Sequence, residues 1–139
     1  MNQPENLSSE PLDSLILLAE SGTDEDWDKI DAYLSGHSDD PELAAWAREN
    51  TANADEGLRD LAASIFEVSS AQLSGSDIAL LQSLMADSSY PGFRAACALA
   101  KRIEQEEVQT MKEEIRAKLE QFMGDADVAE IAQGYLTTL

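Results

Sequence analysis

Apolar residues recur at intervals of three or four along most of the chain, in short runs separated by polar turns. After Thr23, for example, Trp27, Ile30 and Leu34 have the spacing of one face of an α-helix. No run has the alternation of apolar and polar residues that is typical of a half-buried β-strand. The pattern predicts an all-α protein with eight helices, which begin near residues 12, 24, 41, 55, 77, 91, 107 and 126. The seventh is expected to continue to residue 123.

Capping residues support several of these boundaries. Thr23 precedes the second helix and has Asp26 three residues later, which is a weak form of the capping box. Asp40 and Pro41 open the third helix, because Asp is a favoured N-cap residue and proline fits the first helical position. Ser76 is predicted to cap the fifth helix. The connections are short, so consecutive helices are expected to be antiparallel neighbours.

Three of the predicted helices contain segments that align with one another, residues 58–65, 93–100 and 128–135. Their first residues are 35 positions apart, and each segment follows another amphipathic helix. Leu61 and Phe93 are expected in the core, and Ile131 on the apolar face of the last helix. This periodicity is typical of repeated helical hairpins that bury their apolar faces against each other. We therefore expect a disordered segment over residues 1–10 and one domain over residues 11–139. In that domain about four antiparallel hairpins stack into a short right-handed solenoid. An irregular helical bundle is the alternative.

The middle copy, residues 78–103, resembles a HEAT-like repeat. It has an apolar first helix, a turn that contains Asp87, and a second helix in which Arg94 follows Phe93. The resemblance implies that Asp87 and Arg94 belong to a ladder of polar contacts between adjacent repeats. Arg59 occupies the same position in the first copy, and Ala129 replaces it in the third.

The charge of the chain is strongly negative, with 28 acidic and 9 basic residues and a net charge of −19. Residues 1–70 hold 17 acidic and 3 basic residues, a net charge of −14, against −5 for residues 71–139. Nucleic acids and anionic membranes bind positive surfaces, so this charge disfavours both as partners. A protein partner with a basic surface is expected instead.

The densest acidic stretch lies between residues 24 and 42, where eight carboxylates accompany one base, Lys29. Some of these acids are explained by the helix dipole, which favours negative charge at a helix N-terminus. The remainder predicts an acidic edge that docks a basic partner, and solubility is the competing explanation. The predicted edge consists of Asp24, Asp26, Asp28, Asp31, Asp39 and Asp40.

A stacked solenoid also presents the polar faces of its second helices as a concave surface. In this chain that surface would be lined by Arg59, Ser64, Glu67, Arg94, Lys101 and Arg102. Both surfaces predict a non-enzymatic protein–protein interaction module. A sharper alternative is an inhibitor or immunity-type protein whose acidic face mimics nucleic acid to block a basic enzyme.

Residues for catalysis or metal binding are sparse. His37 is the single histidine and has no nucleophile in a fitting local context, and the single cysteine, Cys97, lies in an apolar run and is expected to be buried. Asp24, Asp26 and Asp28 have EF-hand spacing, but Lys29 and Ser35 replace the required Gly and Glu, which disfavours a calcium site.

These features predict no catalytic activity, no metal and no cofactor. An enzyme with a carboxylate site is the remaining rival, and it would need Glu-x-x-His pairs on facing helices. The N-terminal residues do not resemble a signal peptide, and no apolar run approaches the roughly 20 residues of a membrane span. A cytoplasmic location is expected.

Overall fold

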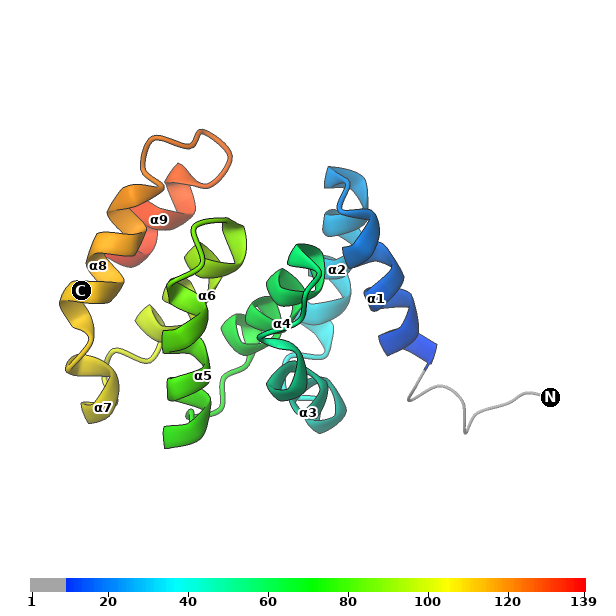
Figure 1. Cartoon of the computed structure of the whole chain (residues 1–139), viewed down its shortest axis with the longest axis horizontal. Coiled ribbons are helices and arrows are strands. Elements are labelled where there is room, and N and C mark those ends of the chain that lie inside the picture. Colours follow the sequence, from blue (N-terminus) through cyan, green and yellow to red (C-terminus); the bar gives the residue numbers. More distant parts are fainter. Residues whose placement is uncertain (1–9) are drawn as a thin grey trace. The chain divides into compact units, whose positions relative to one another are not determined.

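The computed structural model of the chain describes residues 10–139 and contains no β-strand within that range (Figure 1). Its regular elements there are nine helices, so the predicted all-α class is confirmed. The chain forms two compact units that meet in the sequence between Ser70 and Ala71. None of the helices in the described range is long and apolar enough to cross a membrane.

The first unit contains two helical hairpins. Its helices are α1 (Glu10–Ser21), α2 (Asp24–Gly36), α3 (Pro41–Asn50) and α4 (Glu56–Val68). Helix α1 packs against α2, α3 packs against α4, and α4 also contacts α1 and α2. Helix α4 is therefore the centre of the unit, and Leu61 on it is fully buried, as predicted. Gly57 lies where α4 meets α1, directly against the main-chain carbonyl of Ala19.

Side-chain caps determine where three of these helices begin. Thr23 Oγ1 accepts a hydrogen bond from the Asp26 amide at 3.1 Å, and Asp40 Oδ1 accepts one from the Glu42 amide at 2.9 Å. Both caps were predicted from the sequence and are confirmed. Asp55 acts in the same way for α4, because its Oδ1 accepts a hydrogen bond from the Leu58 amide at 3.1 Å. Each cap satisfies an amide that has no partner inside its own helix.

The second unit is centred on α6. Its helices are α5 (Gly75–Met85), α6 (Tyr90–Ala100), α7 (Glu106–Gln109), α8 (Lys112–Gln121) and α9 (Ala129–Leu136). Helix α6 packs against α5, α8 and α9, and α8 packs against α9. Phe93 on α6 is fully buried, and its ring centroid lies 4.9 Å from that of Phe122 at the end of α8. The predicted core position of Phe93 is confirmed.

Three boundaries in this unit differ from the sequence predictions. The predicted helix over 107–123 is two helices, α7 and α8, separated by a turn in which the Thr110 hydroxyl donates to the Glu107 carbonyl at 2.7 Å. Ser74 caps α5 in place of Ser76, since its Oγ accepts a hydrogen bond from the Asp77 amide at 3.1 Å. Helix α9 begins only at residue 129, and Ile131, predicted on its apolar face, is 40% exposed.

The larger architecture stays a prediction. The structure describes each unit as packed hairpins, whereas the right-handed solenoid, the single domain over residues 11–139 and the HEAT-like resemblance remain expectations. Of the predicted disordered segment, residues 1–9 lie outside the described residues, and Glu10 already belongs to α1.

Candidate functional site

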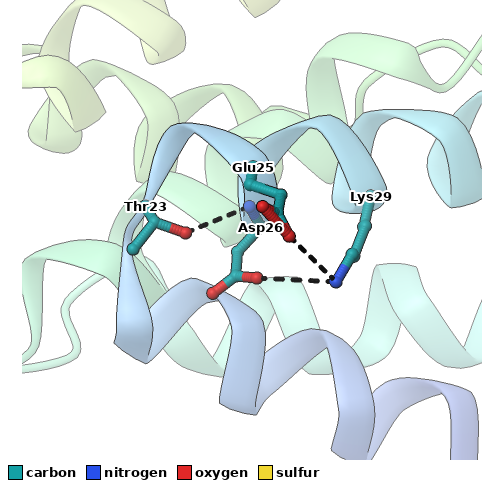
Figure 2. A network of polar contacts seen from close by, with 4 residues as sticks. All are labelled: Thr23, Glu25, Asp26 and Lys29. Atoms are coloured by element: carbon teal, nitrogen blue, oxygen red, sulfur yellow. Dashed lines mark hydrogen bonds and ion pairs between the residues drawn. The ribbon is translucent and has the colours of Figure 1, made fainter.

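The N-terminus of α2 carries a small network of polar contacts (Figure 2). Lys29 Nζ lies 3.8 Å from Glu25 Oε1 and 3.9 Å from Asp26 Oδ1, while the Asp26 amide donates to Thr23. A side-chain hydrogen bond with Ser21 is the main cause that lowers the pKa of Asp26, and Thr23 and Lys29 lower that pKa further against the opposing effect of burial. Asp26 is thus an ionised residue that helps to form the start of the helix.

Three other aspartates form an exposed row along α2, which we call the acidic ridge: Asp24, Asp28 and Asp31. Their spacing of four and three residues places them on one helix face. The buried residues Ile30 and Leu34 of the same helix lie in the core of the unit. Within the part of the chain that the structure describes, the carboxylates of Asp24 and Asp28 have no hydrogen bond or ion pair. The nearest base in the sequence, Lys29, is already paired with Glu25 and Asp26.

The two aspartates after α2 have structural contacts instead. Asp40 caps α3. Asp39 accepts hydrogen bonds from the Ser70 amide at 3.1 Å, from the Ser70 hydroxyl at 2.9 Å and from the Ser69 hydroxyl at 3.3 Å. It therefore ties the turn between α2 and α3 to the chain that follows α4. Asp26, Asp39 and Asp40 of the predicted edge therefore have structural contacts, and Asp24, Asp28 and Asp31 form the exposed acidic ridge, in which Asp31 also has an interaction of its own.

The basic residues predicted to line a concave surface are partly used inside their own units. Arg59 is half-buried, and its Nη1 donates to the carbonyls of Asn53 at 2.9 Å and Ala54 at 3.2 Å. Arg102 is only 6% exposed, with Nη2 donating to the Ala71 carbonyl at 3.1 Å and Nη1 to the Ala98 carbonyl at 3.2 Å. Its predicted position on an exposed surface is corrected, because backbone carbonyls hold the guanidinium in the interior.

The other members of that predicted surface differ in exposure. Lys101 is exposed, whereas Arg94 and Glu67 are half-buried. Ser64 is only 3% exposed, so it is also corrected to an interior residue. These residues belong to two different units, and their participation in one surface stays a prediction.

His37 closes the C-terminal end of α2. Its ring stacks on Tyr33 with centroids 3.9 Å apart and an interplanar angle of 5°, and its Nδ1 lies 2.9 Å from the Tyr33 carbonyl oxygen. Burial is the main cause that raises the pKa of Tyr33, with Asp40 and Glu42 adding to the effect. Cys97 is buried, as expected. In the described part of the chain, no three acidic, histidine or cysteine side chains are grouped to hold a metal ion.

No family model, curated protein or solved structure matches this chain. Its function must therefore follow from its own residues. Among them, the acidic ridge combines exposed charge with two carboxylates, Asp24 and Asp28, that have no hydrogen bond or ion pair among the described residues.

The two kinds of acidic residue should respond differently to substitution. Replacing Asp39 with alanine removes the acceptor of three hydrogen bonds and is expected to lower the free energy of unfolding by about 1–2 kcal/mol. Replacing Asp28 with alanine, the matched control, should leave that free energy unchanged or slightly raised, because it removes a repulsive charge without removing a contact. Urea denaturation compares the two variants. Equal midpoints for both would contradict the structural role of Asp39.

Proposed function

We propose that this chain is a non-enzymatic protein-interaction module whose acidic ridge docks a basic protein partner. The observation that supports the proposal is the exposure of the carboxylates of Asp24 and Asp28, which have no hydrogen bond or ion pair among the described residues. These charges lie in the more acidic part of the sequence, where residues 1–70 have a net charge of −14.

The requirements of the fold do not account for the whole ridge. Asp24 lies in the first turn of α2, where the helix dipole favours a negative charge. Asp28 lies beyond that first turn, where the effect of the helix dipole has fallen off. Like charges three or four residues apart destabilise a helix by about 0.2–0.5 kcal/mol per pair. The pair Asp24 and Asp28 therefore opposes helix stability slightly, which is the pattern expected for residues kept for binding.

A ridge of this kind acts mainly through long-range electrostatics. Exposed charge pairs contribute about 0.2–1 kcal/mol each, so the ridge itself supplies modest affinity. Its larger effect is on encounter, because an extended negative field steers a positive surface towards it and raises the association rate. Binding by this module should weaken as salt is added, since the Debye length falls from about 10 Å at 0.1 M to about 3 Å at 1 M.

The proposal is tested by nuclear magnetic resonance titration of the ¹⁵N-labelled full chain with a synthetic lysine-rich helical peptide. We expect the amide shifts to change most in α2, around the ridge. A double variant, Asp24→Asn with Asp28→Asn, should weaken binding of the peptide by roughly threefold to tenfold at low salt. Asparagine keeps the size of each side chain while removing its charge.

The matched control removes the same number of charges from the second unit. Glu104→Gln with Glu120→Gln alters two exposed glutamates and should leave the affinity within about twofold of the wild type. Shift changes spread evenly over the acidic residues of both units would refute the proposal, as would equal loss of affinity in the two double variants.

A further inference from the structure

Helix α1 presents an apolar side chain to the outside of the first unit. Leu15 and Ala19 are buried where α1 packs against α2 and α4. Leu17 lies two residues from each of them, about 200° around the helix axis, and is 68% exposed. This is the largest exposed fraction of any large apolar side chain that the structure describes. Leu17 therefore adds little to the core that holds α1 in place.

Two carboxylates flank Leu17 on the same side of α1. Asp13 precedes Leu17 by four residues and Glu20 follows it by three, so the three side chains are neighbours on the helix surface. Both acids are exposed, and neither has a hydrogen bond or ion pair within the described residues. No base lies in α1. We call Asp13, Leu17 and Glu20 the outer face of α1, an apolar centre with a negative charge at each end, roughly 10 Å apart along the axis.

The composition of this face indicates what it can bind. Leucine is not required to form the helix, because glutamine, glutamate and lysine are about as good helix formers. A second copy of the chain would bring the outer faces of two α1 helices together, and like charges placed across an interface oppose binding. An anionic membrane surface is repelled in the same way. The complementary surface is an aliphatic side chain between two positive charges.

We propose that the outer face of α1 docks an amphipathic helix of a protein partner, in which an aliphatic side chain lies between two basic residues. Leu17 packs against the aliphatic side chain, while Asp13 and Glu20 pair with the bases three or four residues to either side of it. The carboxylates speed encounter and set the register, and burial of Leu17 slows dissociation. The inference rests on the proposed function, a module that binds a basic protein, and adds an apolar contact on a second helix.

The affinities of two lysine-rich helical peptides for the full chain test this docking face. The peptides differ only at one central position, which is leucine in one and alanine in the other. Isothermal titration calorimetry should show that the wild type binds the leucine peptide roughly fivefold to tenfold more tightly. Leu17→Ala should bind both peptides with the affinity of the alanine peptide. Ile131→Ala is the matched control, because it truncates an exposed aliphatic side chain of α9 and should keep the wild-type ratio.

The acidic ridge variant separates this inference from the proposed function. Asp24→Asn with Asp28→Asn should weaken both peptides by the same factor and preserve the ratio of their affinities. Loss of that effect would contradict the docking role of the ridge, whereas the ratio would still report on Leu17. Equal binding of the two peptides by the wild type, or a wild-type ratio in Leu17→Ala, would overturn the docking face on α1. A lower melting temperature of Leu17→Ala by several degrees would also overturn it, because the leucine would then belong to the core.

Discussion

Replacing Phe93 with alanine is expected to lower the free energy of unfolding by about 3–5 kcal/mol, the typical effect of deleting a buried aromatic ring. Phe93 is fully buried on α6, and its ring lies 4.9 Å from Phe122, centroid to centroid. The deletion therefore leaves a cavity where α6 packs against the end of α8. Urea denaturation followed by circular dichroism measures the change.

Met123 supplies the control for this experiment. It follows Phe122 directly but is 37% exposed. Met123→Ala should therefore lower the free energy of unfolding by well under half as much as Phe93→Ala does. A loss below about 1 kcal/mol for Phe93→Ala would contradict the described packing, because so small an effect is typical of a surface position.

The second large effect is expected at Gly57. A Cβ atom built on Gly57 would lie 2.1 Å from the Ala19 carbonyl oxygen, and both atoms of that clash belong to rigid parts of the helices. Gly57→Ala must therefore force α4 away from α1. We expect it to lower the free energy of unfolding by about 1–3 kcal/mol or more. At a helix position with free space around the glycine, the same change would stabilise the protein by about 0.5–1 kcal/mol, because glycine is a poor helix former.

Gly134 in α9 is the matched control, since a Cβ atom there would meet nothing within 4 Å. Gly134→Ala should raise the melting temperature while Gly57→Ala lowers it. A rise in both variants would show that α4 and α1 are not in close backbone contact, and it would refute the packing described for the first unit.

The sequence predicted those helix starts and core positions that depend on residues close to them in the chain. Thr23 and Asp40 were identified as caps because an N-cap acts on amides only two or three residues away. Leu61 and Phe93 were identified as core residues because they lie on the apolar faces of strongly periodic segments. Ser74 and Ser76 show the limit of this reasoning, since either serine fits a cap by type and only the backbone selects Ser74.

Contacts between distant parts of the sequence were not predictable in the same way. Asp39 looked like one more acid of a charged edge, whereas its partners Ser69 and Ser70 are about thirty residues away. Arg102 was predicted on the polar face of a second helix, but the carbonyls of Ala71 and Ala98 accept hydrogen bonds from its guanidinium in the interior.

One sequence signal for close packing was present. Glycine precedes the aligned apolar residue in two of the copies, as Gly57 before Leu58 and Gly92 before Phe93. At both positions a Cβ atom would clash with a main-chain carbonyl oxygen, at 2.1 Å from Ala19 and at 1.9 Å from Asp87. Recurrence of glycine at an aligned position therefore indicated where the backbone comes closest to its neighbours.

The acidic site was predictable as a region but not residue by residue. The density of carboxylates between residues 24 and 42 predicted an acidic region, because the charge of a segment can be counted directly from its sequence. Which of these acids have structural contacts depends on the partners that the fold brings near, such as Ser21 for Asp26. The structure shows hydrogen bonds of Asp26, Asp39 and Asp40, and the exposed aspartates of the acidic ridge remain the candidates for binding.

The proposed docking role is tested most directly by the salt dependence of the association rate. Stopped-flow mixing with the lysine-rich peptide should give, for the wild type and for the Glu104→Gln, Glu120→Gln control, a rate that falls steeply as salt rises. The Asp24→Asn, Asp28→Asn variant should associate more slowly at low salt and show a shallower slope. The same rate and the same slope for all three proteins would contradict a docking role for the acidic ridge.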